Sequence, residues 1–552
     1  MFASSHLDIH RRAQLHAAGL SHHFGGGALF QDLSVTLHEH TRLAVIGANG
    51  TGKSTLLRIL AGHLAPWAGR VRVAPVDATV GLIGQRHAVG RGTAVHGDVH
   101  SLVAVRTGVH AAQVALEAAE DQLADADEAS LEDRTVRHGG ALQRWLALGG
   151  ADLERRVDEL LVQVAPGVDG SDPLGRLSGG QWARVELAAV LLARFDVLLL
   201  DEPGNDLDLD GTERLRGYLN SRRGPTVIAT HDRSLVDSWA TEVLELDRGR
   251  WYLTQGGLDD HQRARELGLA AELEVWRRDQ ERRERLRSQA DVRRSWAARG
   301  RRKAAGERDK YVRAAARGGA ERQAGLAAQA AREAGVIAVS RPTSPWRLQL
   351  ELPGPLAGPE LVLSLDEVRH PRLPGPVSAS LHHGERLAVV GPNGCGKTTL
   401  LALAAGALTA TAGRVLAPAA GEIIYLDQHR DALAGGTASV AEIVSGMLPT
   451  VTVAGVRSLL AKFGVDDQSA GRGARELSDG LATRVVLAVA SARPCRLLVL
   501  DEPTNHLDLQ ARGQLVDALG RWPGTLLLAT HDRALLDGLG ARVLDLSAGA
   551  GP

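Results

Sequence analysis

Lysine, cysteine and aromatic side chains are scarce in this chain, and long apolar runs are missing from it. Its two cysteines, Cys395 and Cys495, are too few for a disulfide framework, which indicates a reducing compartment and predicts a cytoplasmic protein. No apolar stretch approaches the roughly 20 residues that a helix needs to cross a bilayer, so we expect no insertion into a membrane. Apolar residues still make up 44% of the 552 residues, enough for sizeable cores in roughly three or four domain-sized units.

The few lysines mark a phosphate-binding pattern that occurs twice. Arginine outnumbers lysine by 59 to 5, yet Lys53 and Lys397 both stand in the pattern GxxxxGK[ST], at 47–54 and at 391–398. Each pattern follows a strand-like apolar run and precedes a helical one, which is the setting of a P-loop, where glycine N–H groups surround a phosphate. A compact ammonium fits such a loop where a guanidinium does not, so a chain that otherwise uses arginine retains lysine there.

The two P-loops open two copies of a longer series of motifs. Each is followed by a glutamine (85, 428), an LSGGQ-like motif (177–181, 477–480), an apolar run that ends in DEP (203, 503) and an ATHDR motif (229–233, 529–533). Ser178 precedes Asp201 by 23 residues, as Ser478 precedes Asp501. The chain therefore contains one α/β unit written twice, here called the first repeat (1–258) and the second repeat (341–552).

A proline-free linker, 259–340, separates the repeats. Residues 259–337 carry 20 Lys/Arg and 13 Asp/Glu, a net charge of +7, whereas the whole chain carries −1. Strong helix formers dominate this stretch, so we expect an α-helical hairpin that turns within 298–319, with Gly300 and Gly318 as candidate breakers. A basic helical segment of this kind can bind a polyanion; the alternative is that it is a solvated charged connector.

Both repeats resemble ATP-binding cassette (ABC) nucleotide-binding domains. Two cassettes on one chain, no membrane domain and a charged helical linker resemble the ABC-F family in particular, over nearly the whole chain. The resemblance implies a monomeric ATPase whose two cassettes pair head to tail around two ATPs. It also implies that the linker binds the ribosome, through rRNA, with P-site tRNA as a further candidate. Abundant Arg, Ala and Gly indicate GC-rich coding and an actinobacterial source.

The resemblance gives each motif residue a role, in a phosphoryl transfer that depends on positioning and charge neutralisation. Glu202 and Glu502 would polarise the attacking water. His231 and His531 would contact the γ-phosphate, with capping or packing as the alternative. The Mg²⁺ ligands would be Ser54, Gln85, Asp201, Thr398, Gln428 and Asp501. ATP would be bound by Phe24, Gly47, Asn49, Gly50, Gly52, Lys53, Ser54, Thr55, Gln85, Ser178, Gly179, Gly180 and Gln181 in the first repeat, and by Gly391, Asn393, Gly394, Gly396, Lys397, Thr398, Thr399, Gln428, Ser478 and Gly480 in the second.

The repeats are not equivalent. Asp479 replaces a signature glycine, and its carboxylate is expected to weaken the ATP site built on Lys53. Phe24 suits the aromatic residue that stacks on adenine, with core packing as the alternative. The matching place in the second repeat, judged by its spacing from the P-loop, offers Val368 or His370 and no aromatic.

Two further segments are candidates for contacts with a partner. Between its glutamine and its signature motif the first repeat is 43 residues longer than the second, a helical, acidic insertion over about residues 95–170. It corresponds either to the arm with which ABC-F proteins touch the ribosome or to an enlarged helical subdomain. In the linker, the candidate nucleic-acid contacts are Arg293, Arg294, Trp296, Arg299, Arg301, Arg302 and Lys303, where the tryptophan can stack on a base.

The resemblance to ABC-F proteins, together with the basic linker, implies an ATPase that binds the ribosome and protects it from an antibiotic. A general translation factor of the same family is one alternative. Another is the ATPase subunit of a drug exporter that works with a separate membrane protein. The exporter has no need of a long basic linker, whereas action on the ribosome requires one.

Overall fold

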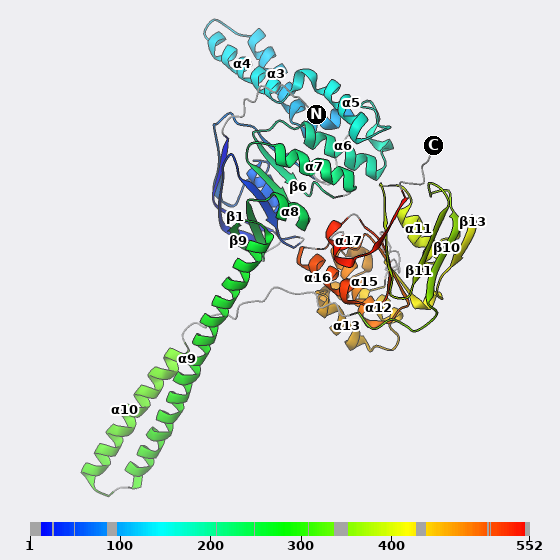
Figure 1. Cartoon of the computed structure of the whole chain (residues 1–552). Coiled ribbons are helices and arrows are strands. Elements are labelled where there is room, and N and C mark those ends of the chain that lie inside the picture. Colours follow the sequence, from blue (N-terminus) through cyan, green and yellow to red (C-terminus); the bar gives the residue numbers. More distant parts are fainter. Residues whose placement is uncertain are drawn as a thin grey trace. The chain divides into compact units, whose positions relative to one another are not determined.

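The computed structural model divides into two compact units, residues 1–258 together with 347–552, and residues 259–346 (Figure 1). It describes residues 13–24, 27–48, 50–84, 97–205, 207–247, 249–306, 308–335, 352–392, 394–426, 438–477, 479–504, 507, 509–530 and 532–546.

A six-stranded sheet in the order β5-β6-β7-β3-β8-β9 forms the centre of the first repeat, and β9 runs antiparallel to β8. Its strands are β3 (Arg42–Ile46), β5 (Val80–Ile83), β6 (Val197–Asp201), β7 (Thr226–Ala229), β8 (Glu242–Asp247) and β9 (Arg250–Gln255). The inner strands are almost wholly buried. Their sequences, such as VLLLD, are continuous apolar runs, because a parallel sheet is covered on both faces.

A second, antiparallel sheet in the order β2-β1-β4 lies across the helix that follows the first P-loop. Its strands are β1 (Gln14–Phe24), β2 (Gly27–Leu37) and β4 (Ala68–Ala74). Apolar side chains of helix α1 (Lys53–Leu60) share one core with this sheet and with β3. The start of α1, where the P-loop ends, is thereby held between two sheets.

The remaining helices of the first repeat share a second core with the main sheet. They are α2 (Val99–Arg106), α3 (Val109–Ala124), α4 (Leu131–Ala147), α5 (Leu153–Val164), α6 (Gly179–Leu192), α7 (Leu209–Ser221) and α8 (Arg233–Trp239). Helices α3 and α4 form a projecting hairpin, and α4 has no buried residue (Figure 1).

The second repeat has the same strand order, without a counterpart of β9 among its described residues. Its main sheet runs β14-β15-β16-β12-β17 and its antiparallel sheet β11-β10-β13. The strands are β10 (Leu361–Arg369), β11 (Val377–His382), β12 (Arg386–Val390), β13 (Ala412–Leu416), β14 (Ile423–Leu426), β15 (Leu497–Asp501), β16 (Thr525–Ala529) and β17 (Arg542–Asp545). The helices are α11 (Lys397–Ala404), α12 (Val440–Met447), α13 (Val453–Lys462), α14 (Asp467–Ala470), α15 (Asp479–Ala492), α16 (Leu509–Arg521) and α17 (Arg533–Leu539). The predicted α/β class is confirmed for both repeats.

The linker is an antiparallel hairpin of α9 (Leu258–Gly306) and α10 (Lys310–Ala334) (Figure 1). At 1.5 Å per residue, α9 extends over about 74 Å and α10 over about 38 Å. The arms are therefore unequal, and the turn follows Gly306. Asp309 caps α10 by accepting a hydrogen bond from the backbone N–H of Tyr311 at 2.7 Å.

Small residues hold the two linker helices together. Buried alanines recur every seven residues, at 290, 297 and 304 on α9 and at 320, 327 and 334 on α10. The sequence suggests Gly300 as a helix breaker, but α9 continues through it. A Cβ there would lie 3.1 Å from Cβ of Ala320, so this glycine serves close helix approach. Gly318 likewise lies inside α10.

In the part of the chain that the structure describes, no helix is both long enough and apolar enough to cross a bilayer.

Candidate nucleotide-binding sites

Each P-loop lies at the carboxyl end of a central strand, β3 or β12, and leads into a helix, α1 or α11. Gly47 and Gly391 both have a φ of 145°, which side chains disfavour. A Cβ on Gly47 would also collide with the carbonyl oxygen of Leu246. The two loops thus share this glycine conformation, and each leads into the N-terminus of a helix, where backbone N–H groups can bind a phosphate.

Both P-loop lysines fold back onto their own loop. The ammonium of Lys53 donates to the carbonyl oxygen of Gly47 at 2.8 Å, and that of Lys397 donates to the carbonyl oxygen of Gly391 at 2.9 Å. Each lysine is 8% exposed. A buried ammonium at the start of the helix that follows a P-loop is a fitting site for a triphosphate.

In the first repeat the lysine also meets the histidine of the ATHDR motif. Nε2 of His231 lies 2.9 Å from Nζ of Lys53 and 3.2 Å from Oε1 of Glu202. In one tautomer Nε2 accepts from the lysine, and in the other it donates to the glutamate. The structure therefore brings together three of the predicted site residues, from three separate motifs.

The two DEP glutamates share an unusual backbone. Glu202 and Glu502 have φ values of 52° and 45°, in the left-handed region that non-glycine residues rarely adopt. Their backbone N–H groups donate to the carbonyl oxygens of Ala229 and Ala529, at 2.8 and 2.9 Å. Such strain costs about 1–3 kcal/mol and concentrates at functional sites.

The carboxyl groups of the first site are poised for proton and metal chemistry. Burial raises the pKa of Glu202 to about 7, which suits a general base near neutral pH. Burial also raises the pKa of Asp201, and a hydrogen bond from Ser54 opposes that change. A hydroxyl group beside a carboxylate matches the oxygen ligands that Mg²⁺ prefers. The residues present therefore fit Mg²⁺ and ATP.

The signature motif of the first repeat begins a helix. Ser178 and Gln181 form a capping box at the start of α6, in which the Ser178 N–H donates to Oε1 of Gln181 at 2.9 Å. Gln181, a candidate nucleotide ligand, thus has a structural role as well. In the second repeat Gly480 is buried, and Asp479 is the first residue of α15.

One link in the first repeat was missed by the sequence reasoning. Arg184 of α6 donates to Oδ2 of Asp208 at 2.6 Å, and Asp208 caps α7 through the N–H of Gly211 at 2.9 Å. The signature helix is thereby tied to the end of the loop that follows the DEP motif. Nothing in the local sequence around Arg184 indicates this partner.

The candidate base-stacking positions differ between the repeats. Phe24 ends β1 and is 80% exposed, so core packing is not its role in this structure. Val368 has no exposed surface, so that candidate for the matching place is wrong. His370 is half-buried, and its Nδ1 accepts the backbone N–H of Arg372 at 3.3 Å.

Several predicted site residues lie outside the described residues. They are Asn49, Gln85, Asn393, Gln428, Ser478 and His531.

The predicted nucleic-acid contacts lie on the described linker hairpin. Trp296 is 54% exposed. Arg293 is half-buried and reaches the carbonyl oxygen of Leu326 at 3.4 Å, across the hairpin. The remaining basic side chains are exposed, namely Arg294, Arg299, Arg301, Arg302 and Lys303. Tyr311, 86% exposed beside the turn, is an aromatic residue that the sequence reasoning did not single out.

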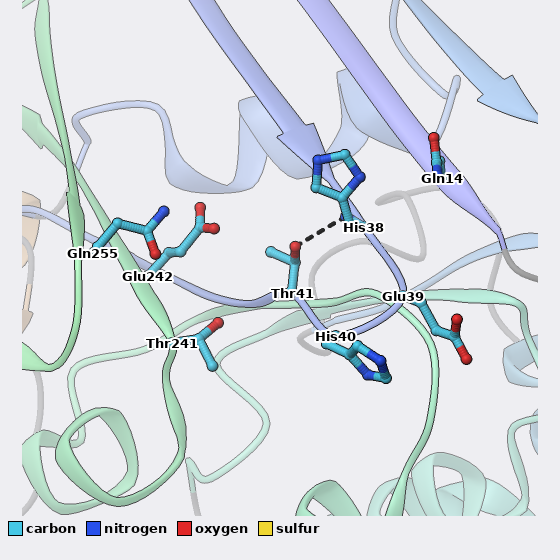
Figure 2. Close-up of a pocket in the computed structure, with 8 residues that line it drawn as sticks. All are labelled: Gln14, His38, Glu39, His40, Thr41, Thr241, Glu242 and Gln255. Atoms are coloured by element: carbon cyan, nitrogen blue, oxygen red, sulfur yellow. Dashed lines mark hydrogen bonds between the residues drawn. The ribbon is translucent and has the colours of Figure 1, made fainter.

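A separate hollow of about 440 Å³ lies in the first repeat (Figure 2). Figure 2 shows His38, His40 and Thr41 just before β3, with Thr241 and Glu242 at the start of β8. These are the amino ends of parallel strands. Ligands of open α/β sheets bind at the carboxyl ends, so the hollow is not part of the candidate site.

A family model described as "ABC transporter" matches residues 30–205 and 375–505. The chain is 32% identical over 543 residues to the tylosin resistance ATP-binding protein TlrC of Streptomyces fradiae, and the match covers 95% of each chain. It is 30% identical over 523 residues to the energy-dependent translational throttle protein EttA of Mycobacterium tuberculosis, with 93% of this chain and 88% of the relative covered.

A solved structure shares the fold over nearly the whole chain. It is the archaeal ribosome recycling factor aABCE1 in complex with the ribosomal stalk protein aP1, with a TM-score of 0.57 at 19% identity. The match covers 96% of this chain and 87% of that one.

Proposed function

This chain belongs to the ABC-F family of ATP-binding cassette proteins, and from that premise we propose that it is a ribosome-binding ATPase that protects the ribosome from an antibiotic. The observation that carries the proposal is its similarity to TlrC, whose name records resistance to tylosin, over 95% of both chains. The helical linker with a net positive charge supports it, because such a limb neutralises the phosphates of rRNA.

The proposed reaction is hydrolysis of ATP to ADP and phosphate. Lys53 and Lys397 would bind the β- and γ-phosphates in their loops. Glu202 and Glu502 would accept a proton from the water that attacks the γ-phosphorus, and the pKa of about 7 for Glu202 suits this task. Mg²⁺, held by Ser54 and Asp201 or their counterparts, would neutralise charge on the phosphate oxygens.

We propose that ATP hydrolysis releases the protein from the ribosome. When ATP holds the two repeats together, the protein stays on the ribosome, and when the γ-phosphate leaves, it dissociates. Residues of the ATHDR motifs would report that loss, since His231 already lies within 3.2 Å of the carboxylate beside the reaction. The cell compartment that this function requires is the cytoplasm.

EttA supports a second candidate, a general translation factor. Its name records an energy-dependent effect on translation, and its similarity to this chain also spans most of both proteins. A factor of this kind would act on every ribosome, with or without a drug.

Co-sedimentation and translation assays test the proposal together. The double variant Glu202→Gln, Glu502→Gln should retain ATP, stop turning over and sediment with ribosomes, whereas Lys53→Ala with Lys397→Ala should not sediment. The wild type should restore translation in the presence of one ribosome-targeting antibiotic from a panel that includes tylosin. Binding without any restoration would favour the translation factor. Absence of ATP-dependent sedimentation would contradict both and favour an exporter subunit.

A further inference from the structure

We propose that Trp67, Arg70 and Arg72, at the antiparallel sheet of the first repeat, form a second RNA-binding surface, here called the sheet surface. The proposal rests on the action on the ribosome proposed above, to which it adds an RNA contact beside that of the linker.

The two arginines lie on the solvent side of the sheet. Successive side chains of a strand point to opposite faces. In β4, Val71 and Val73 pack against the core beneath the sheet, so Arg70 and Arg72 lie on the other face, where both are exposed. Among the described residues neither guanidinium forms a hydrogen bond or an ion pair. Both positive charges are therefore available to a ligand.

The neighbouring strand does not neutralise these charges. Arg70 lies opposite Ala18, and Arg72 lies opposite His16. The three strands of the sheet contain one acidic residue, Asp32 of β2, against the two arginines of β4. The sheet therefore presents a net positive charge to an anionic partner.

Trp67 adds an exposed aromatic face just before β4. It is 73% exposed, in a chain with only 3% aromatic residues. Its backbone N–H donates to the carbonyl oxygen of Ser21 at 2.9 Å, and its ring packs against that of His23 with the centroids 4.9 Å apart. These contacts hold the indole in place and leave most of it open. An indole held in this way can stack on an unpaired base.

The second repeat provides an internal comparison. Its Arg369 accepts the N–H of Thr411 at 2.9 Å, as Ser21 accepts that of Trp67. The residue after each donor pairs with the residue that accepts, in the same antiparallel register. Thr411 therefore stands in the place of Trp67.

The same register shows that the charges differ as well. Arg414, the counterpart of Arg70, lies opposite Asp366, and Leu416 takes the place of Arg72. Opposite charges across a strand pair attract each other. The second sheet thus forms without an exposed tryptophan and without a second arginine on β13. The fold does not require these residues in the first repeat, which favours a binding role for them.

An indole beside two free guanidinium groups suits RNA. Arginine binds phosphates and also stacks on planar groups, and an aromatic ring stacks on any base. An unpaired segment of RNA offers phosphates and open bases together, whereas a base-paired helix hides the faces of its bases. The partner of the sheet surface is therefore a single-stranded or looped segment of RNA.

The test measures the affinity of the full chain for a short single-stranded RNA oligonucleotide. The parent carries the linker changes Arg299→Ala, Arg301→Ala, Arg302→Ala and Lys303→Ala, which suppress the other contact. Trp67→Ala should weaken binding about tenfold, as the loss of one stacking contact does, and Trp67→Phe should retain most of it. Arg70→Ala with Arg72→Ala should reduce the salt slope by about 0.7 per lost phosphate contact.

The matched control is Thr411→Ala with Arg414→Ala, which changes the corresponding positions of the second repeat and should bind the oligonucleotide as the parent does. An equal loss in this control would overturn the proposal, because charge anywhere on the chain would then suffice. A parent that binds no oligonucleotide would overturn it too. So would a Trp67→Ala variant that loses affinity for ATP and not for RNA, since the indole would then belong to the nucleotide site.

Sedimentation with ribosomes separates the sheet surface from the function on which it rests. In the background of Glu202→Gln with Glu502→Gln, changing all three residues of the sheet surface to Ala should weaken sedimentation. If the parent itself does not sediment, the proposed function fails, whereas the oligonucleotide assay still decides whether the sheet surface binds RNA. Weaker sedimentation with unchanged oligonucleotide binding would identify a ribosomal protein as the partner and overturn the proposal.

Discussion

Arg184 and Asp208 join the signature helix of the first repeat to the loop after its DEP motif, with a separation of 2.6 Å. Asp208 is 7% exposed. A buried carboxylate that is also a helix cap depends on its partner to offset the cost of leaving water. Through this ion pair, a movement of the signature helix can shift the loop that lies next to Glu202.

We expect Arg184→Ala to lower the free energy of unfolding by about 1–3 kcal/mol, because it removes a charged hydrogen bond to the buried carboxylate of Asp208. The ATPase rate should fall as well, since the loop near Glu202 loses its tether. Thermal unfolding and steady-state hydrolysis measure the two effects. The control is Arg214→Ala, whose exposed pair with Asp210 at 2.8 Å should contribute less than about 1 kcal/mol. Equal effects of both changes would contradict the assignment.

The pKa of Glu202 predicts a pH-dependent stability. Its value is raised from 4.5 to about 7 in the folded protein. Below pH 4.5 the carboxyl group is protonated in both the folded and the unfolded chain, so its ionisation does not change the free energy of unfolding. Between pH 4.5 and 7 the unfolded chain ionises first, so stability falls, by about 3 kcal/mol in total. Above pH 7 the loss is constant.

Glu202→Gln removes this titration and provides the measurement. In the absence of nucleotide the variant should gain stability relative to the wild type as the pH rises from 5 to 8. Denaturant unfolding at both pH values gives the two differences. A difference that does not change with pH would show that the carboxyl group titrates normally.

The linker predicts a salt-dependent contact with RNA. Replacing Arg299, Arg301, Arg302 and Lys303 with Ala should weaken ribosome binding and reduce its salt slope by up to about one unit per lost phosphate contact. Basal ATPase activity should be unchanged, because these exposed side chains belong to the hairpin unit. Sedimentation at several salt concentrations is the measurement.

A matched variant separates position from charge. Arg263, Arg265, Arg277 and Arg278 lie in the first half of α9, away from the turn of the hairpin, and changing all four to Ala removes the same charge. This variant should retain the salt slope of the wild type. Equal slopes in the two variants would mean that net charge alone attracts the ribosome.

Asp479 predicts unequal nucleotide sites. It begins α15, where a carboxylate stabilises a helix but repels a phosphate. If the repeats pair as in the family, Asp479→Gly should tighten ATP at the Lys53 site, measured in a Lys397→Ala background. The reciprocal change, Gly179→Asp, should weaken the Lys397 site. Unaltered affinities in both variants would remove Asp479 from nucleotide binding.

Contiguous motifs indicated the candidate sites from the sequence. The P-loops, the DEP carboxylates and the ATHDR histidines each place their candidate groups within a few residues, and short stretches of chain have few conformations once glycines and apolar strands frame them. Their repetition at matching intervals identified two α/β units. The excess of arginine in a proline-free stretch likewise indicated the helical linker.

Tertiary structure decided what depended on packing between distant segments. Gly300 suggests a turn by composition, yet the helix continues because its missing side chain admits Ala320 of the opposite helix. Arg184 and Asp208 form their ion pair only because α6 packs near the loop after β6. Val368 packs into the core beneath the antiparallel sheet of the second repeat and has no exposed surface, so its distance along the chain from the P-loop does not identify a residue that can stack on a base.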